Sequence, residues 1–312
     1  MRNGTQAVPY NYFTNYDAII CKREKIILVD LFFAFCFTGT CFVHYTDSSF
    51  PDIALLWADL TYNRVYDKIK VYLLFGGRKM NFAILLAGGV GARMGQPTPK
   101  QYLIIENKPV LIYTLETFEH CDNIDRIVIV ADPVWHGQIR QWLSQYHISK
   151  FLDFADPGIT RQDSVYSGLC RCISHSESEQ DIVLVHEAAR ALISNDLICR
   201  IIAGLDGYQA CIPVMPMKDS ILLSYNGNTI DDLLERSTLF CGQAPESFHL
   251  RPYYALNKQT PPEELASYRA DHELCFHNHW RVHCIPGEES AFKLTTPGDI
   301  EQMIAYLKHT QP

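Results

Sequence analysis

The sequence has no Cys-X-X-Cys pair, and none of its 11 cysteines stands at zinc-finger spacing from a histidine. Several cysteines lie in apolar runs, such as Cys211 in QACIPV, which predicts small buried side chains and a reducing compartment, the cytoplasm. An excess of positive charge is also absent, because 27 Lys and Arg stand against 35 Asp and Glu, a formal charge of −8. This balance argues against a nucleic-acid partner, since contacts to a phosphate backbone need a basic field. Any bound phosphate must therefore meet a few locally placed cations.

Residues 1–79 lack a repeat, a motif and a hinge-like linker. They contain a long apolar run, Ile26–Tyr45, which has enough residues to span a bilayer but includes Asp30 and shows no clear helical pattern. The run also starts too far into the chain, without a clean cleavage site, for a signal peptide. A membrane anchor and an accessory structural segment stay open as interpretations. We predict instead that 1–79 is an over-extended start, that the functional chain begins near Met80, and that the protein has no membrane partner.

From Asn81 onward, strand-like apolar runs alternate with amphipathic helix patterns. Strands are expected in 81–88, 124–133, 151–158, 181–190 and 208–214, and helices in 109–121, 134–146, 160–172 and 194–205. The first helix is expected to carry Pro109 at its first position, and the third to use Thr160 as N-cap with Asp163 three residues later. This alternation predicts an α/β fold, a Rossmann-like, mostly parallel twisted sheet with helices on both faces. An Asn-Gly turn between two β-like runs in 216–245 predicts a protruding β-arm.

The stretch ILLAGGVGARMGQPTPKQY, Ile84–Tyr102, passes from an apolar strand into glycines and then into cations. It is not a dinucleotide-binding GxGxxG loop, because Met94 stands where the third glycine belongs and the two prolines that follow exclude a helix. It is not a P-loop, because no GK[ST] closes it. A glycine-rich loop followed by Arg93 and Lys100 on an irregular segment suits a free triphosphate at the carboxyl end of the first strand. A solvated surface loop is the alternative.

The same stretch resembles the signature of the cytidylyltransferases that activate polyol phosphates with CTP. Four further blocks match in order: PGITRQDSVYSGL (157–169), VLVHEAARALIS (183–194), ERSTLFCGQAPESF (235–248) and AFKLTTPGDI (291–300). The resemblance covers 80–307. It implies a cytidylyltransferase domain over 80–312, with a nucleotide-diphospho-sugar transferase-like fold and an arm at about 216–245. It also implies an enzyme that transfers CMP from CTP to a polyol phosphate and releases pyrophosphate.

The resemblance assigns residues to the nucleotide. Its catalytic cations match Arg93 and Lys100 at the triphosphate, and Lys293, in a closing strand, near the acceptor phosphate. Backbone contacts to the nucleotide match Ala87, Gly88, Gly89 and Gly91, and contacts to cytosine match Gly158 and Ser164. Mg²⁺ is implied, bound mainly through the CTP phosphates. From the residues alone, Ser164 could equally be an ordinary first-turn helix serine, and Lys293 an exposed strand lysine.

The resemblance also assigns residues to the acceptor. Glu187 and Arg190 match an acid that meets the acceptor hydroxyls and a neighbouring arginine. Arg236, on the arm, matches an arginine supplied in trans to the acceptor phosphate, which implies a homodimer. Asp271 matches a further acceptor-binding residue. Without the resemblance, Glu187 and Arg190 could form a structural ion pair beside the sheet.

Some positions depart from the family's pattern. Glu187 and Ala191 stand where Asp and Pro are usual, and Ala270 stands where a threonine hydroxyl would meet the acceptor phosphate, a loss for which Arg269 could compensate. The expected acceptor is 2-C-methyl-D-erythritol 4-phosphate, for isoprenoid precursor synthesis. D-ribitol 5-phosphate, for surface polymers, and a non-catalytic dimeric paralogue are the alternatives. A sugar-1-phosphate nucleotidyltransferase is disfavoured, because its further acidic metal ligands are not found.

Overall fold

The computed structural model describes residues 32–35, 41–44, 79–89 and 98–310. The chain divides into two units, Met1–Gly76 and Gly77–Pro312. In the first unit, β1 (Phe32–Phe35) pairs antiparallel with β2 (Cys41–His44), so these parts of the long apolar run are strands. The rest of that run, and the interpretations placed on it, lie outside the described residues. None of the helices in the described ranges is long and apolar enough to cross a membrane.

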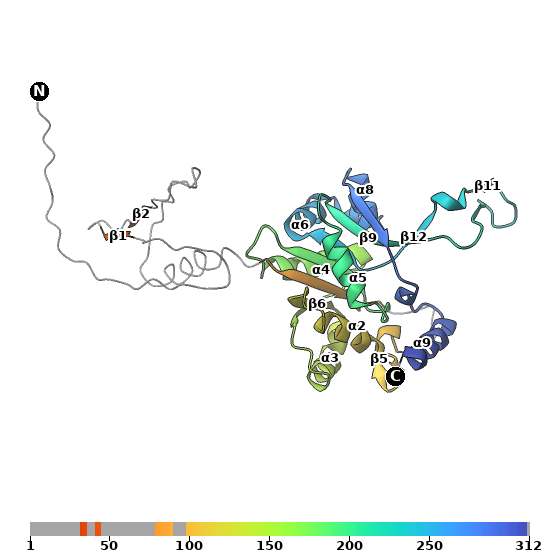
Figure 1. Cartoon of the computed structure of the whole chain (residues 1–312), viewed down its shortest axis with the longest axis horizontal. Helices are drawn as coiled ribbons and strands as arrows, with labels where there is room; N and C mark the ends of the chain where they lie inside the picture. Colours follow the sequence, from red (N-terminus) through yellow and green to blue (C-terminus); the bar gives the residue numbers. More distant parts are fainter. Residues whose placement is uncertain (1–31, 36–40, 45–78, 90–97, 311–312) are drawn as a thin grey trace, which may run out of the picture. The chain divides into compact units, whose positions relative to one another are not determined.

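The second unit is built on a mixed sheet with strand order β12-β9-β13-β8-β3-β6-β7, and β14 also pairs with β9 (Figure 1). The strands are β3 (Asn81–Leu86), β6 (Arg126–Val130), β7 (Phe151–Ala155), β8 (Ile182–Glu187), β9 (Ala210–Pro216), β12 (Phe240–Gly242), β13 (Glu246–His249) and β14 (Val282–Pro286). Neighbours among β8, β3, β6 and β7 are parallel, as are β14 and β9. Strands β12 and β13 run antiparallel to their partners. The mostly parallel α/β sheet predicted from the sequence is confirmed.

Helices cover both faces of the sheet, because its central strands are apolar on both faces. They are α2 (Val110–Glu119), α3 (Pro133–Gln145), α4 (Arg161–Ile173), α5 (Asn195–Ala203), α6 (Leu250–Gln259), α7 (Pro262–Leu265), α8 (Asp271–His277) and α9 (Pro297–Thr310). Along β3, Ala83 and Leu85 belong to the buried cluster that includes α2, α3 and α5. Phe82 and Ile84 belong to the opposite cluster, with α4, α6 and α8. The period of two along a strand therefore fixes which helices lie on which face.

Local signals set where the helices begin. At α4, the Asp163 N–H donates to the Thr160 hydroxyl and the Thr160 N–H donates to the Asp163 carboxylate, which is the predicted capping box. The prediction for α2 is wrong by one residue. Pro109 is the N-cap of this helix, because its extended backbone belongs to the hairpin of β4 (Ile104–Ile105) and β5 (Lys108–Pro109).

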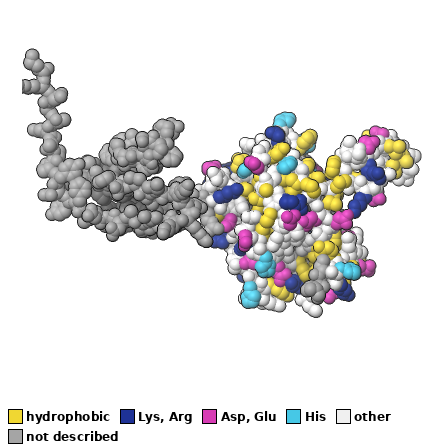
Figure 2. All heavy atoms as spheres, viewed as in Figure 1, with side chains coloured by type: hydrophobic (Ala, Val, Ile, Leu, Met, Phe, Trp, Pro, Cys, Tyr) yellow, Lys and Arg dark blue, Asp and Glu magenta, His cyan; other side chains and the backbone are white. Residues whose placement is uncertain are grey.

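The predicted hairpin leaves the sheet after β9 and returns at β12 (Figure 1). Within it, β10 (Leu222–Leu223) pairs with β11 (Asp232–Leu233), and the turn residue Gly227 has φ +75°. The short 3₁₀ helix η3 (Arg236–Thr238) follows. Several apolar side chains of this arm are exposed: Leu222, Tyr225, Ile230, Leu233 and Phe240. Figure 2 shows hydrophobic side chains on the far end of the arm.

The chain between β14 and α9 forms no strand, although a strand was expected around Lys293. It contains only the 3₁₀ helix η4 (Glu289–Ala291). Its backbone N–H groups bond to separate places, Gly287 to the Val214 carbonyl, Glu288 to the Gln243 side chain and Leu294 to the Ala189 carbonyl. Because no single strand takes these bonds, the expected ladder does not form. We call Gly287–Thr295 the closing segment.

Candidate active site

The predicted nucleotide residues lie where β3 and β7 end. Gly88 approaches the loop after β7 so closely that an added Cβ would lie 2.5 Å from the Cβ of Pro157. At Gly158 an added Cβ would lie 2.1 Å from the Cβ of Asp163. Gly89, by contrast, has no described atom within 4 Å of its Cβ position. Glycine is therefore required by the chain's own packing at Gly88 and Gly158, whereas at Gly89 it leaves open space.

The carbonyl groups of the glycine-rich loop are held by the 3₁₀ helix η2 (Lys100–Tyr102). The Ala87 carbonyl accepts from the Gln101 amide at 2.6 Å and from the Tyr102 hydroxyl at 2.8 Å. The Gly89 carbonyl accepts from the same Gln101 amide at 2.8 Å. Gly91 and Arg93 lie outside the described residues. The described end of the loop is thus fixed to the segment that begins with Lys100.

Lys100 and Lys293 meet at the closing segment. The Lys100 ammonium donates to the backbone carbonyl of Leu294, the residue directly after Lys293. The fold therefore brings Lys100 next to the segment that carries Lys293, 193 residues away in the sequence, and the catalytic role of both stays a prediction.

Ser164 takes part in the loop that was expected to read cytosine. Its hydroxyl accepts from the Gly158 N–H and donates to the Thr160 carbonyl, both at 3.0 Å. These bonds shape the start of α4, as the first-turn interpretation requires. A contact between Ser164 and a base stays a prediction.

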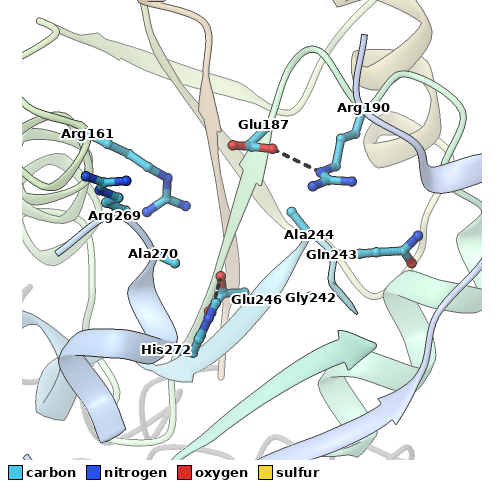
Figure 3. Close-up of a pocket in the computed structure, with 10 residues that line it drawn as sticks. All are labelled: Arg161, Glu187, Arg190, Gly242, Gln243, Ala244, Glu246, Arg269, Ala270 and His272. Atoms are coloured by element: carbon cyan, nitrogen blue, oxygen red, sulfur yellow. Dashed lines mark hydrogen bonds and ion pairs between the residues drawn. The ribbon is translucent and has the colours of Figure 1, made fainter. Parts of the chain in front are cut away.

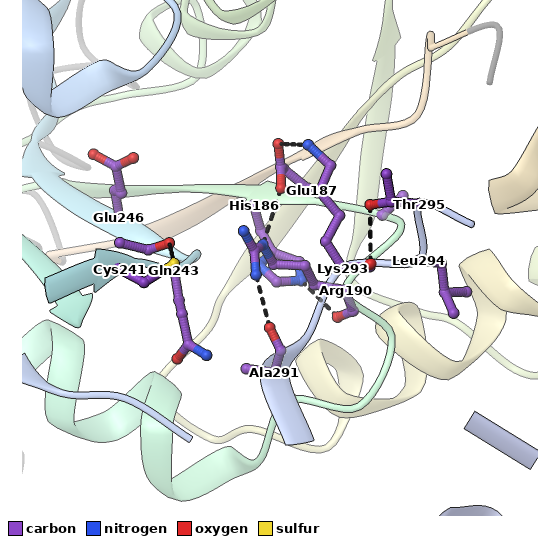
Figure 4. A network of polar contacts seen from close by, with 12 residues as sticks. His186, Glu187, Arg190, Cys241, Gln243, Glu246, Ala291, Lys293, Leu294 and Thr295 are labelled. Carbon is purple, nitrogen blue, oxygen red and sulfur yellow. Dashed lines mark hydrogen bonds and ion pairs between the residues drawn. The ribbon is translucent and has the colours of Figure 1, made fainter. Parts of the chain in front are cut away.

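Glu187, at the end of β8, pairs with two cations (Figure 4). Its Oε1 lies 2.6 Å from the Lys293 Nζ, and its Oε2 lies 2.9 Å from the Arg190 Nε. Burial alone would raise the pKa of the Glu187 carboxyl, but Lys293 and Arg190 outweigh it and lower this pKa to about 2. Arg190 also donates to the Ala291 carbonyl at 2.8 Å. The ion pair between Glu187 and Arg190 is therefore present, and Glu187 also pairs with a second cation, Lys293, from the closing segment.

His186 stabilises the turn between Glu187 and Arg190. Its Nε2 lies 3.1 Å from the Arg190 carbonyl, and burial lowers the pKa of the imidazole to about 4. The ring is therefore neutral at pH 7, and the Nε2–H donates to the carbonyl. This bond closes the turn over which Glu187 and Arg190 face each other.

The closing segment is also tied to the base of the arm. The Gln243 side chain, directly after β12, donates to the Glu288 carbonyl at 2.8 Å and accepts from the Glu288 N–H at 3.0 Å. The Glu288 carboxylate accepts from the Ser194 hydroxyl at the start of α5. Lys218, where the arm begins, pairs with Glu289. A displacement at the base of the arm would therefore reach Lys293 through the closing segment.

A cavity of about 90 Å³ lies beside Glu187 (Figure 3). Its lining residues are Arg161, Glu187, Arg190, Gly242, Gln243, Ala244, Glu246, Arg269, Ala270 and His272. Figure 3 places Arg161 and Arg269 on one side of it and Glu187 and Arg190 on the other. The cavity thus collects charged side chains from α4, β8, β13 and α8.

Asp271 does not line this cavity, which corrects its assignment to the acceptor. Its side chain is 0% exposed, and both carboxylate oxygens are taken. Oδ2 lies 2.6 Å from the Arg161 Nη2, and Oδ1 accepts from the Tyr253 hydroxyl at 2.6 Å. Asp271 therefore holds Arg161 in place and is too deeply buried to contact a ligand directly.

Arg236 lies on the exposed arm and donates to the Lys218 carbonyl within the arm at 3.1 Å. Its contribution to a partner's site stays a prediction. For the predicted Mg²⁺, the described residues contain no group of three or more His, Cys, Asp or Glu side chains placed to hold a metal ion. The side chains of this part of the chain do not form a protein-held metal site.

The sequence did not point to Arg161, Glu246 or His272 as site residues. Arg161 stands directly after the N-cap of α4 and looks like an ordinary first-turn residue, since nothing in the local pattern links it to Asp271 110 residues later. Glu246 lies within the matched block GQAPESF, but its carboxylate received no role there. The available signal was a charged residue directly before the buried Ser247 and Phe248.

Known proteins resemble this chain over its second unit. The family model for IspD, 2-C-methyl-D-erythritol 4-phosphate cytidylyltransferase, matches residues 81–309. A ribitol-5-phosphate cytidylyltransferase of Vibrio parahaemolyticus is 34% identical over 221 residues, 70% of this chain and 92% of the relative. A 2-C-methyl-D-erythritol 4-phosphate cytidylyltransferase of Rubrobacter xylanophilus is 33% identical over 223 residues, 70% of this chain and 90% of the relative.

A solved structure agrees with the sequence matches. The 4-diphosphocytidyl-2C-methyl-D-erythritol synthase of Anaerococcus prevotii superposes with a TM-score of 0.61 at 26% identity, over 74% of this chain and 96% of that one. The chain therefore belongs to the IspD family of cytidylyltransferases, which are CTP-dependent nucleotidyltransferases.

Proposed function

We propose that this protein transfers CMP from CTP to the phosphate of a small polyol phosphate and releases pyrophosphate, with 2-C-methyl-D-erythritol 4-phosphate as the first candidate acceptor. The observation that carries the proposal is the convergence of Lys100, Lys293 and Arg190 on the closing segment, next to the glycine loop after β3. Three cations beside close-packed glycines suit a triphosphate and a second phosphate.

In the proposed reaction, an oxygen of the acceptor phosphate attacks the α-phosphorus of CTP. A new P–O bond forms as the bond from the α-phosphorus to the bridging oxygen breaks, and that electron pair leaves with pyrophosphate. The nucleophile is already anionic, so no general base is required. The protein must align the reactants and offset the charge that crowds at phosphorus.

Lys100 and Lys293 supply this charge, and Arg93 is proposed to add to it. Lys100 is held by the Leu294 carbonyl, so its ammonium does not have to be ordered anew when the ligand arrives, whereas Lys293 must exchange its Glu187 partner for the phosphate. We also propose that Mg²⁺ accompanies CTP, bound by phosphate oxygens and not by a protein cage.

The proposed assembly is a homodimer in which the arm supplies Arg236 to the neighbouring site. The support is the arm itself, an exposed hairpin that carries apolar side chains and is anchored in its own protomer only at its base. We place the reaction in the cytoplasm, because the eight cysteines whose side chains are described are all free thiols.

D-ribitol 5-phosphate is the second candidate acceptor. Two of the curated relatives, 34% and 30% identical to this chain, are ribitol-5-phosphate cytidylyltransferases. Ala270 also lies at the cavity wall in place of the hydroxyl that the methylerythritol pattern expects.

The test is pyrophosphate release by the protein with CTP and Mg²⁺, with 2-C-methyl-D-erythritol 4-phosphate and D-ribitol 5-phosphate offered in separate reactions. Release with the first acceptor alone supports isoprenoid precursor synthesis, and release with the second alone supports polyol activation for surface polymers. If neither acceptor releases pyrophosphate, the proposal is wrong. A shift of the melting temperature by CTP would then still identify a nucleotide-binding protein.

A further inference from the structure

We infer that Gln101 is a positioning residue for CTP, because its side chain turns residues 87–89, the described start of the glycine-rich loop, so that a backbone N–H group faces the nucleotide phosphates. This inference rests on the proposed function, in which CTP is the ligand of that loop. Gln101 itself is 3% exposed, so it acts on the ligand through the backbone and not by direct contact.

The Gln101 amide uses both of its hydrogens on the loop. Its Nε2 donates to the Ala87 carbonyl at 2.6 Å and to the Gly89 carbonyl at 2.8 Å. A side-chain amide nitrogen carries two hydrogens, so no donor is left for another partner. One buried side chain therefore fixes the direction of the carbonyl groups on both sides of Gly88.

The direction of a carbonyl group decides where the next N–H group points. The peptide bond between Ala87 and Gly88 is trans, and in a trans peptide the C=O and the N–H point in opposite directions. The Gly88 N–H therefore points away from Gln101, and it finds no acceptor among the described residues. The Ala87 N–H, by contrast, donates to the Val130 carbonyl at 2.8 Å and continues the sheet. A free N–H group at the carboxyl end of a parallel strand is placed to bind an anion.

The glycines show on which side of the loop a ligand has room. An added Cβ at Gly88 would lie 2.5 Å from the Cβ of Pro157, whereas at Gly89 no described atom lies within 4 Å of the Cβ position. Pro157 therefore limits the loop at Gly88, and Gln101 holds its carbonyl groups. The space beside Gly89 stays open for a phosphate to approach the backbone.

The neighbouring Tyr102 strengthens the same hold. Its hydroxyl donates to the Ala87 carbonyl at 2.8 Å, and its ring centroid lies 4.3 Å from that of Trp135 in α3. Burial raises the pKa of Tyr102, so the hydroxyl keeps its proton and remains a donor at neutral pH. The Ala87 carbonyl thus accepts from two buried side chains, which is more than a carbonyl in a solvated surface loop requires.

The 3₁₀ helix η2 also connects the loop to the proposed catalytic cation. Lys100, its first residue, donates to the Leu294 carbonyl of the closing segment, while Gln101 and Tyr102 bind the loop. A change at Gln101 would therefore alter the position of the loop relative to Lys100. The distance between the backbone donors and the lysine is set by one short helix.

The test measures the Kd of CTP with Mg²⁺ by isothermal titration calorimetry, without acceptor, at pH 8 and at pH 5.5. In Gln101→Glu the carboxylate cannot donate and repels the two carbonyl groups, whereas its protonated form donates once. Burial raises the pKa of such a carboxyl, so protonation falls within this pH range. Relative to wild type at the same pH, we expect Kd to rise about 100-fold at pH 8 and about 10-fold at pH 5.5.

A neutral variant separates lost donation from added charge, because a carboxylate near the phosphates would repel them by itself. Gln101→Met has a similar length and carries neither a donor nor a charge. We expect its Kd for CTP to rise about 10- to 30-fold at both pH values. Gln138→Glu, at an exposed position of α3, is the matched control for the titration of CTP and of the other groups, and it should bind as wild type does at each pH.

The outcomes separate this inference from the proposed function. Wild-type affinity in a folded Gln101→Met variant overturns the inference while the proposed function stands, and so does an equal loss in both Gln101 variants at both pH values. If neither variant folds, Tyr102→Phe, which removes one bond to the Ala87 carbonyl and keeps the ring against Trp135, should raise Kd about fivefold, and an unchanged Kd would overturn the inference. A wild-type protein that binds no CTP overturns both.

Discussion

Glu187 is the carboxylate that pairs with two cations of the candidate site. It is 17% exposed and binds one cation from its own turn, Arg190, and one from the closing segment, Lys293. From the sequence, Glu187 was assigned to the acceptor hydroxyls, and its ion pair with Arg190 was the alternative interpretation. The sequence could not predict the pairing with Lys293, because a residue 106 positions away has no periodic relation to the turn.

The pairing of Glu187 predicts how stability depends on pH. Its pKa in the folded protein, about 2, lies below the ordinary value of 4.5, so its contribution is complete above pH 4.5 and is lost as the pH falls towards 2. Across this range we expect the free energy of unfolding of the wild type to fall by about 3 kcal/mol more than that of Glu187→Gln. Urea denaturation at several pH values measures this difference. Glu177→Gln, at an exposed position, is the control, and parallel curves for Glu187→Gln and wild type would contradict the prediction.

We expect the Lys100→Ala variant to lose activity but to keep its fold. Replacing it with alanine removes one charge from the proposed triphosphate site, and we expect kcat/KM to drop by about 10²- to 10³-fold. The circular dichroism spectrum should not change, because the Lys100 side chain lies outside the main buried clusters. Lys258→Ala, on the exposed side of α6, is the matched control. Near-normal turnover by the Lys100 variant would remove this lysine from the mechanism.

At the scale of single residues, contiguous motifs point to the groups around the glycine-rich loop, whereas the cavity lining has no such motif. Gly88, Gly158 and Lys100 stand in contiguous motifs, where spacing alone carries information. Arg161, at the start of α4, and Asp271, at the start of α8, come together only through tertiary packing. No local pattern contains that contact, so Asp271 was placed in the ligand site when it lies beneath it.

Secondary-structure elements were predicted well wherever one strong signal acted alone. The apolar runs gave β3, β6, β7, β8 and β9, and the Thr160 cap fixed the start of α4. A strand was expected around Lys293 because the block AFKLTTPGDI resembles the family's closing strand. The backbone N–H groups of the closing segment instead donate to the Val214 carbonyl, the Gln243 side chain and the Ala189 carbonyl. Such tertiary contacts cannot be predicted from the local sequence.

The link between the arm and the closing segment gives a prediction for Gln243. In Gln243→Ala, both backbone groups of Glu288 lose their partner, which should cost about 2 kcal/mol and loosen Lys293. We therefore expect a lower melting temperature together with a lower kcat. Thermal denaturation and pyrophosphate release measure the two effects. Gln138→Ala, on the exposed face of α3, should show neither, and identical behaviour of the two variants would contradict the link.

The proposed role of the arm predicts complementation between two differently mutated protomers of the homodimer. If Arg236 serves the neighbouring protomer, Arg236→Ala and Lys100→Ala are defective alone but complement each other when unfolded together and refolded. A 1:1 mixture should recover about a quarter of wild-type activity, because half of the dimers are mixed and each has one intact site. Lys100→Ala refolded alone is the control. Failure to recover activity, with mixed dimers demonstrated by differential tagging, would place Arg236 in its own protomer's site or in none.

At the scale of the whole molecule, the family match spans residues 81–309 and the described site residues all lie in the unit Gly77–Pro312. The prediction is that Met80–Pro312, produced alone, releases pyrophosphate from CTP with the kcat and KM of the full chain. Its buried clusters run from Phe82 to Leu307. A soluble fragment with much lower activity would assign a role to residues 1–79, whereas equal activity would leave them outside the chemistry.

The Glu187–Lys293 pair has a consequence for the end of the proposed catalytic cycle. An incoming phosphate must draw Lys293 away from a carboxylate 2.6 Å distant, so part of its binding energy is spent on that exchange. After the reaction, the same carboxylate offers Lys293 a partner to which it can return as the product leaves. Because the Glu187 carboxylate competes with phosphate for Lys293, the site would bind anions less tightly than it would without Glu187, and it would release them sooner. The pair would in this way protect the turnover rate from slow product dissociation.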